Sequence, residues 1–275
     1  MLTVNNNAGA LVALQNLTAT SAQLQQTQNR VSTGLAIGSP QDNGAIWAIA
    51  QNERGNSDSL DAVIQSLQRA QSTVQVATSA GTSVSNLLNQ LKTISLSASD
   101  TSLDSTSLAA YNTQFKSVLN QINQVVNNSD FNGVNMIKSG GTTVFALATA
   151  TGGQLTVAAA SLALGGANMG TGLTATSSIG TQSAAAAMVT TIQTAITKVN
   201  AALGQLGTGA TSLQNQLTFT QNLQDTLDTG VGNLVNANLG KESAQLTALQ
   251  TKQQLGIQAL SIANQSSSVL LSLFR

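Results

Sequence analysis

Residues 60–91, LDAVIQSLQRAQSTVQVATSAGTSVSNLLNQL, decide the fold of this chain. Apolar side chains recur there in alternating steps of three and four residues, which is the spacing of one face of an α-helix. Nine of the ten positions of this stripe are apolar, and Gly81 is the exception. The pattern predicts a helix over residues 58–97, about 60 Å long at 1.5 Å per residue. Asp58 and Asp61 favour its start, because carboxylates stabilise the positive end of the helix dipole.

The same spacing returns twice further along the chain. A second stripe covers residues 108–125, and a third covers residues 189–220. The segment between the first two stripes, residues 99–106, is rich in Ser, Thr and Asp, as a turn between antiparallel helices needs to be. The sequence therefore predicts a mainly α fold, an elongated antiparallel bundle of long helices over residues 58–128 and 183–229.

The middle of the chain, residues 132–181, has a different pattern. Glycine pairs separate two short runs with β propensity, residues 142–147 and 154–158, which predict a small β-hairpin region. Charged and large side chains are scarce there. We expect a modest exposed elaboration at the distal end of the bundle.

Both ends of the chain carry amphipathic patterns of their own. Leu17, Leu24 and Val31 are seven residues apart near the start, and Leu255, Ile262 and Val269 are seven apart near the end. An isolated amphipathic helix cannot bury its apolar face, so each end needs a partner. We expect coiled-coil termini that pair with each other and with the ends of neighbouring chains. The predicted assembly residues are Leu14, Leu17, Leu24, Val31, Leu35, Leu255, Ile262, Val269 and Leu273.

The composition argues against an enzyme. The chain has no His and no Cys, which excludes thiol nucleophiles, zinc sites built on these residues and triads that use imidazole. The carboxylate pairs Asp58 with Asp61 and Asp225 with Asp228 favour capping and solvation over acid and base catalysis. We expect no catalytic residue, no cofactor and no metal.

Charge and hydropathy also limit the partners. Only 7% of the residues are charged and the net charge is zero, so nothing indicates binding to nucleic acid. No run approaches the roughly 18 apolar residues of a membrane span. Residues 1–23 hold no Lys or Arg, so no cleavable secretory signal is expected. A protein of this kind would leave the cell through a dedicated machine.

A few charged side chains near the N-terminal stripe are candidates for specific contacts. Ser39, Pro40 and Asp42 predict a helix start, with Ser39 as the cap. Arg30 and Arg54 are two of only ten cations, so each is expected to have a defined acceptor. That acceptor is either within the chain or, alternatively, Asp42 or a carboxylate of another copy.

Several motifs resemble one family. Residues 29–37 (NRVSTGLAI) and 129–134 (SDFNGV) are similar to the N-terminal region of bacterial flagellins. Residues 231–237 (VGNLVNA), 241–244 (KESA) and the tail 271–275 (LSLFR) resemble the C-terminal region of that family. The resemblance covers about residues 1–138 and 189–275 and leaves the middle unmatched, as in a short flagellin with little or no variable outer domain.

The resemblance implies a structural subunit of the flagellar filament, which serves motility. It implies other copies of the chain as partners in a helical filament, together with the flagellar export apparatus, an export chaperone, the filament cap and hook-junction proteins. It also implies an extracellular location and termini that pair into coiled coil when a subunit joins the filament. Two alternatives stay open: a hook-filament junction protein, and a rod-shaped surface adhesin or ligand-binding protein.

The resemblance also divides the chain into parts. Residues 1–40 and 233–275 are the two halves of an inner coiled-coil domain, and residues 41–57 form a spoke segment with contacts at Arg30, Asp42 and Arg54. Residues 58–138 and 183–232 form a helical rod domain. Residues 139–182 are a small β-rich variable region, whose Ser and Thr residues are candidates for glycosylation.

Overall fold

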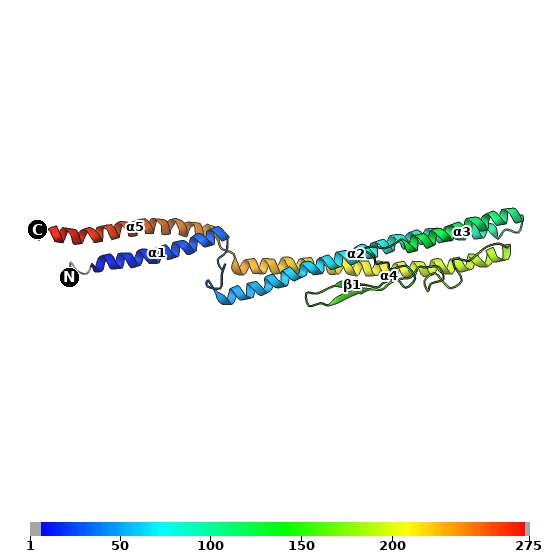
Figure 1. Ribbon diagram of the computed structural model, residues 1–275, viewed down its shortest axis with the longest axis horizontal. Coiled ribbons are helices and arrows are strands. Elements are labelled where there is room, and N and C mark those ends of the chain that lie inside the picture. Colours follow the sequence, from blue (N-terminus) through cyan, green and yellow to red (C-terminus); the bar gives the residue numbers. More distant parts are fainter. Residues whose placement is uncertain (1–6, 273–275) are drawn as a thin grey trace. The chain divides into compact units, whose positions relative to one another are not determined.

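The computed structural model describes residues 7–272, with side chains described as far as residue 265. These residues form five helices and two strands (Figure 1). In chain order the elements are α1 Ala8–Thr33, α2 Gly44–Ala98, α3 Ser105–Asn127, β1 Val144–Leu147, β2 Gln154–Val157, α4 Gln182–Val235 and α5 Leu239–Ser272. The predicted mainly α fold with a small β-hairpin is confirmed. The chain divides into two compact units, unit 1 with residues 1–56 and 226–275 and unit 2 with residues 57–225.

Unit 2 is a bundle of α2, α3 and α4 in which the three predicted stripes form the core. Leu67, Leu88 and Leu91 of α2 and Phe115 of α3 are fully buried. On α3 the buried face ends in Val126 rather than in the predicted Val125. Asp104 caps α3 by accepting a hydrogen bond from the Ser107 amide at 3.1 Å, so the predicted turn between the helices is confirmed.

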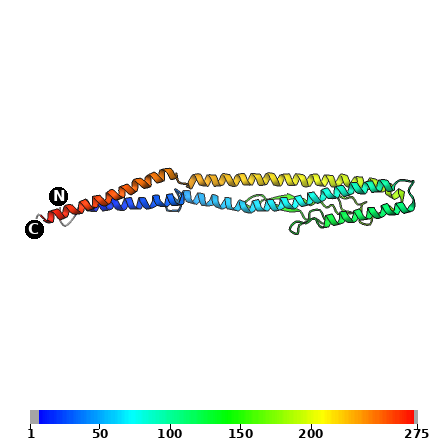
Figure 2. The ribbon, with the colours of Figure 1, turned by 90° about the horizontal axis from the view of Figure 1, so that it is seen from above.

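Polar side chains fix the register between α2 and α4, which run beside each other in unit 2 (Figure 2). From one pair to the next, the residue number rises along α2 by as much as it falls along α4. The two helices therefore keep a single antiparallel register over all four pairs. The pairs and their donor–acceptor distances are Asp61 with Gln224 at 2.8 Å, Gln71 with Gln214 at 2.6 Å, Ser85 with Asn200 at 3.1 Å and Lys92 with Gln193 at 2.6 Å.

Gly81, the exception in the first stripe, lies where two leucines fill the space of a side chain. A Cβ atom added at Gly81 would lie 2.6 Å from Leu203 Cδ2 and 3.2 Å from Leu162 Cδ1. The glycine therefore lets α4 and the middle segment approach α2 closely, and the break in the apolar pattern is part of the packing.

Replacing Gly81 by valine is expected to destabilise unit 2 by roughly 1–3 kcal/mol, because the added branches overpack this contact. Gly204 is the matched control: it also lies in a helix, and nothing lies within 4 Å of a Cβ added there. Gly204→Ala is expected to stabilise the helix by up to about 1 kcal/mol. Chemical denaturation followed by circular dichroism measures both changes, and equal shifts of the same sign would contradict the close-approach explanation.

The start of α2 differs from the prediction. The helix begins at Gly44, not at Asp58, and the Asn43 side chain caps it by accepting from the Ile46 amide at 3.2 Å. The apolar stripe alone gave no sign of this, because Ser57 occupies one of its buried positions and Gly55 does not break the helix. Asp61 consequently lies inside the helix and binds Gln224.

The predicted helix start at Ser39 is also wrong. Residues 39–42 form a separate turn before α2, in which the Asp42 amide donates to the Ser39 carbonyl oxygen at 3.1 Å. Pro40 fits inside this turn, since proline favours the second turn position as well as the first position of a helix. The local sequence signal was therefore compatible with both structures.

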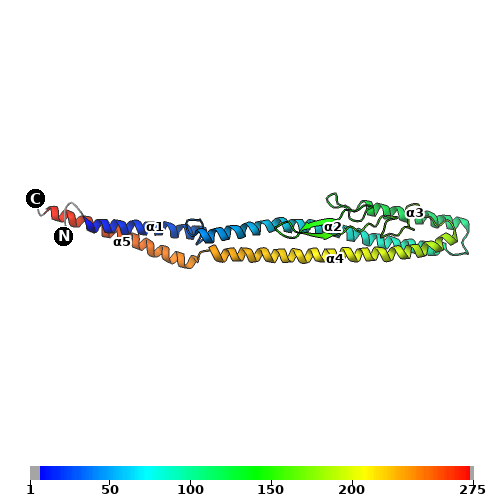
Figure 3. The ribbon, with the colours of Figure 1, turned by 90° about the horizontal axis from the view of Figure 1, so that it is seen from below.

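The predicted hairpin is confirmed, but its surroundings are not those expected. β1 and β2 pair antiparallel, with Val144 opposite Val157. The middle segment is no exposed elaboration, because it contributes six fully buried side chains, Met136, Ile137, Leu162, Met169, Leu173 and Ile179. The hairpin also does not lie at the distal end of the bundle. It packs along α2 and α4 (Figure 3), where the Leu147 amide donates to Ser66 Oγ at 3.0 Å and Gln216 Nε2 donates to the Ala148 carbonyl at 2.8 Å.

Candidate functional site

The terminal helices α1 and α5 form an antiparallel pair in unit 1 (Figure 1). We call the line along which the two helices contact each other the seam. On α1 it contains Leu24 and Thr27, which are buried, and Leu17 and Val31, which are half-buried. The Asn7 side chain closes one end of the seam by donating to the Ala263 carbonyl oxygen at 2.7 Å. The two ends of the chain pair with each other, as predicted, but they do so within a single chain, whereas the resemblance implied that the pair forms when a subunit joins the filament.

The seam on α5 is not the predicted stripe. It consists of two rows with steps of seven residues, Glu242, Leu249, Gly256 and Ala263 in one row and Leu246, Gln253 and Leu260 in the other. A Cβ added at Gly256 would lie 3.2 Å from Leu17 Cδ1, so the glycine allows close approach of the two helices. Because Glu, Gln and Gly interrupt these rows, counting apolar residues selected another face of the helix.

That other face, with Leu255 and Ile262, is largely exposed, and Leu255 also lines a pocket between α5 and α1. Leu255 is 58% exposed and Ile262 is 68% exposed. α1 likewise turns apolar side chains outward, so both helices bear apolar residues on the seam and on the surface. The exposed large apolar side chains of the pair are Leu11, Val12, Leu14, Leu239, Leu255, Ile257 and Ile262.

The nine predicted assembly residues thus fall into four groups. Leu17, Leu24 and Val31 lie in the seam within the subunit, whereas Leu14, Leu255 and Ile262 lie on its surface. Leu35 belongs to a small core at the other end of the pair. The Val269 side chain and Leu273 lie outside the described residues.

The core around Leu35 joins the segment after α1 to the segment between α4 and α5. Gly34 ends α1 with a φ of 74°, and the chain then runs beside residues 235–237. The Ala36 amide donates to the Val235 carbonyl oxygen at 2.7 Å, and the Ala237 amide donates to the Gly34 carbonyl oxygen at 2.8 Å. The core residues are Leu35, Ile37, Ala50, Val231 and Val235.

Arg30 pairs with Glu242 at this junction, with 3.5 Å between Nη1 and Oε1. Glu242 is only 7% exposed, and its Oε2 atom and the Nε atom of Arg30 are buried without a hydrogen-bond partner. Arg30 therefore has its acceptor within the chain, as one of the two alternatives stated, and the other alternative, a pair with Asp42, is not formed. Sequence analysis missed Glu242, and the seven-residue spacing from Glu242 to Leu249 and Gly256 is the signal that could have found it.

Replacing Arg30 by glutamine is expected to loosen the junction, because Glu242 would stay buried without a compensating charge. The expected loss is roughly 1–3 kcal/mol of local stability. Adding Glu242→Gln in the same chain should restore part of it, since the unpaired charge is then gone. Hydrogen exchange of the backbone amides at residues 34–37 and 235–242 measures the loss, and unchanged protection in Arg30→Gln would refute a stabilising pair.

The Asp42 carboxylate accepts hydrogen bonds from the turn to which Asp42 itself belongs. Its Oδ2 atom accepts hydrogen bonds from the Ser39 hydroxyl at 3.0 Å, the Ser39 amide at 3.1 Å and the Gly38 amide at 3.2 Å. The hydrogen bond from the Ser39 side chain, more than any other cause, holds the pKa of Asp42 below its ordinary value. A lowered pKa stabilises the turn above the ordinary aspartate pKa, and this contribution is lost as the pH falls through the lowered value.

Arg54, the third predicted spoke residue, lies half-buried on α2. Within residues 7–265, whose side chains are described, its guanidinium forms no ion pair. Asp42 and Arg54 therefore do not form a pair, and no carboxylate of the described residues serves as the acceptor of Arg54.

Two searches bear on other functions. Among the described residues, no three His, Cys, Asp or Glu side chains are grouped so that they could hold a metal ion. The described helices also lack an apolar stretch long enough to cross a membrane.

Comparison with known proteins identifies the family. The bacterial flagellin N-terminal helical region matches residues 4–142, and the bacterial flagellin C-terminal helical region matches residues 189–274. Flagellin FljM of Caulobacter vibrioides is 52% identical over 272 residues, covering 99% of this chain and 98% of the relative. A flagellin of Brucella melitensis is 36% identical, with both chains covered completely.

A solved structure supports the fold. The crystal structure of Bacillus cereus flagellin superimposes with a TM-score of 0.50 at 20% identity, covering 55% of this chain and 86% of the other. Two matched regions in the expected order, relatives of nearly equal length and a shared fold lead to one conclusion. The chain belongs to the bacterial flagellin family.

Proposed function

We propose that this chain is the structural subunit of a bacterial flagellar filament and that its terminal helices form the contacts between subunits. The observation that carries the proposal is the outward position of Leu255 and Ile262. α5 exposes Leu255, Ile257 and Ile262, whereas its seam with α1 includes Glu242, Gln253 and Gly256. A soluble helix would do the reverse unless its outer face were buried by another molecule.

Burial of these faces supplies a sufficient driving force. Transfer of one Leu, Ile or Val side chain from water to an apolar contact is worth roughly 1.5–3 kcal/mol. A few such side chains on each face offset the loss of translational freedom of an added subunit. The faces of α1 and α5 differ, and contacts between unlike faces generate an open helical fibre instead of a closed ring.

Arg54 and the spoke segment have a role in the same assembly under this proposal. Arg54 forms no ion pair in the described part of the subunit, so a carboxylate of a neighbouring copy is its proposed acceptor. Asp42 shapes the turn that leads into α2, and Arg30 holds the junction through Glu242. All three residues then act on the geometry of the filament and not on a chemical reaction.

The wider setting follows from the same role. We propose an extracellular location in the flagellum, reached through the flagellar export apparatus with an export chaperone, and contacts with the filament cap and hook-junction proteins at the ends of the filament. The flagellin family is structural, so no enzymatic activity and no cofactor is proposed. Glycosylation of the Ser and Thr residues of the middle segment is tested by the intact mass of native protein.

Electron microscopy tests the proposal. Purified protein, seeded with short fragments of its own filaments, is expected to grow into long filaments visible by negative stain. A hook-filament junction protein would join filament ends without extending them. Failure to elongate on self-seeds, at concentrations where a known flagellin elongates, would overturn the proposal.

A further inference from the structure

Three phenylalanines of unit 2 are exposed although aromatic residues make up only 3% of the chain. Phe145 is 60% exposed, Phe219 is 59% exposed and Phe131 is 36% exposed, whereas Phe115 is fully buried. Phe131 and Phe145 line one pocket. Exposed rings that gather at one place on a soluble protein mark an interaction surface.

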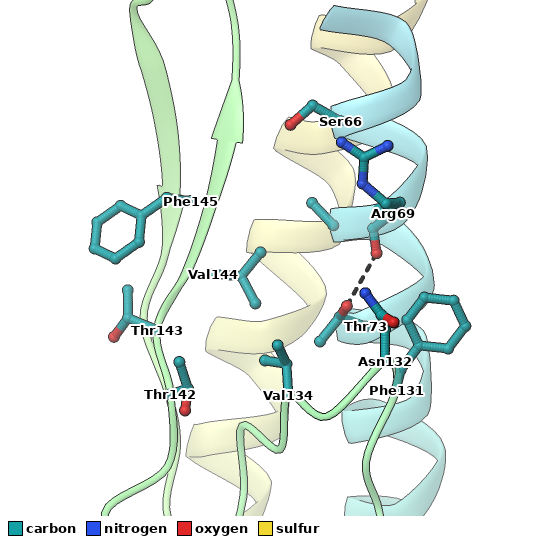
Figure 4. Close-up of a pocket in the computed structure, with 11 residues that line it drawn as sticks. Ser66, Arg69, Thr73, Phe131, Asn132, Val134, Thr142, Thr143, Val144 and Phe145 are labelled. Carbon is teal, nitrogen blue, oxygen red and sulfur yellow. Dashed lines mark hydrogen bonds between the residues drawn. The ribbon is translucent and has the colours of Figure 1, made fainter. Parts of the chain in front are cut away.

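The pocket lies between α2, β1 and the turn at residues 131–134, and its volume is about 260 Å³. Figure 4 shows Phe145 and Phe131 on opposite sides, with Val144 and Val134 between them and Arg69 and Ser66 above. The Thr73 hydroxyl donates to the Arg69 carbonyl oxygen at 2.9 Å and is therefore already engaged. The lining thus combines apolar side chains, two of them aromatic, with one cation and the polar residues Ser66, Thr73, Asn132, Thr142 and Thr143.

Arg69 is the cation of this pocket and has no acceptor. Its guanidinium makes neither an ion pair nor a hydrogen bond to any residue in the described part of the chain. A guanidinium beside an apolar pocket is suited to a carboxylate, which it can bind through two parallel hydrogen bonds. The pocket therefore favours an occupant that presents a carboxylate together with apolar surface.

The two aromatic side chains are held by rigid backbone. The Phe131 and Val134 backbones exchange two hydrogen bonds of 3.0 Å, and Asn132 and Gly133 close this turn with positive φ angles of 50° and 78°. Phe145 lies on β1, opposite Thr156 of β2. Because the rings are already ordered, little conformational entropy is lost when a partner covers them.

We infer that this pocket is a docking site for a second copy of the chain, which places an apolar surface with a carboxylate against Arg69, Phe131 and Phe145. The inference rests on the proposed function. Charge complementarity points to another copy, because unit 2 also bears the exposed carboxylates of Asp58 and Asp225, for which no ion pair occurs among the described residues. The pocket and the carboxylates are two different surfaces of the same chain. Contacts between different surfaces of identical subunits can produce an open fibre.

The size of the pocket argues in the same direction. Sites that enclose a small molecule span roughly 300–1,000 Å³ and bury most of the ligand. This pocket is smaller and has exposed aromatic rims. Aromatic and arginine side chains at the centre of a contact are instead the residues that dominate binding between proteins.

A photo-crosslinking experiment on the full chain tests the inference. The chain has no cysteine, so Thr142→Cys places a single thiol on the pocket lining without removing either phenylalanine. A benzophenone maleimide is attached, and isotope-labelled and unlabelled protein are mixed, polymerised and irradiated. Thr113→Cys, an exposed threonine on α3, is the matched control. Crosslinks that join labelled to unlabelled peptides are expected from position 142, about tenfold above the control.

Second-site variants identify the contacts. In the Thr142→Cys background, Phe145→Ser or Arg69→Gln is expected to lower the yield between copies about tenfold, while the helix content of the monomer is unchanged. Filaments with crosslinks only within one copy, or with yields equal to those from position 113, would overturn this inference alone. If no filaments form and no crosslinks join two copies, the proposed function fails as well, so the two failures are distinguishable.

Discussion

Filament growth is expected to stop when Ile262 is replaced by aspartate, while the isolated subunit stays as stable as the wild type. Ile262 is 68% exposed in the subunit, so a charge there meets water and costs the monomer almost nothing. In the filament the same carboxylate would be buried without a partner, which costs several kcal/mol. A cost of about 4 kcal/mol raises the concentration needed for growth roughly a thousandfold. Light scattering of seeded protein and circular dichroism of the monomer measure the two effects.

Ser261→Asp is the matched control for this change. Ser261 is the neighbouring residue on α5, is also exposed, and gains the same charge on another side of the helix. Its filaments are expected to grow at close to the wild-type rate. Normal growth of Ile262→Asp, or equal loss of growth in both variants, would show that this stripe is not a contact between subunits.

Leu24→Asp is expected to destabilise the monomer itself, unlike Ile262→Asp, because Leu24 lies inside the subunit. Leu24 is 8% exposed in the seam between α1 and α5. An aspartate there leaves a charge without a partner and removes apolar burial, at a combined cost of roughly 3–5 kcal/mol. Helices of 26 and 34 residues that lose their seam are marginal in water. The α1 and α5 pair should therefore separate in the monomer, and filament growth should fail as a consequence.

Hydrogen exchange distinguishes this outcome from general unfolding. In Leu24→Asp the amides of α1 and α5 should exchange rapidly, whereas the core of unit 2 around Phe115 should stay protected. Gln23→Asp adds the same charge at an exposed neighbouring position and should leave both units protected. Protection of α1 and α5 in Leu24→Asp as strong as in the wild type would mean that the seam does not hold the pair together.

The sequence predicted the bundle of unit 2 well because its core is made almost entirely of aliphatic residues. There the apolar spacing and the buried face coincide, as at Leu67, Leu88 and Phe115. The same reasoning failed on α5. Its seam contains Glu242, Gln253 and Gly256, and the apolar stripe with Leu255 and Ile262 is largely exposed. Periodicity shows that a face is apolar, but not which partner covers it.

Other features depended on contacts between distant parts of the chain. The ion pair of Arg30 joins residues more than two hundred positions apart, whereas the Asp42 carboxylate binds neighbouring residues of its own turn. The middle segment has few large side chains, but six of them are fully buried, and Gly81 and Gly209 let the segment approach α2 and α4 closely. A Cβ added at Gly209 would lie 2.6 Å from Val157, which shows how closely the hairpin approaches α4.

The four polar pairs between α2 and α4 have a mechanical consequence. A slip of one helix by a single residue displaces it by about 1.5 Å along its axis, enough to strain all four hydrogen bonds at the same time. Shear applied to α2 is consequently shared with α4 at four levels between Asp61 and Lys92. Unit 2 then keeps its length under load, a property suited to a material that must transmit torque over many repeats.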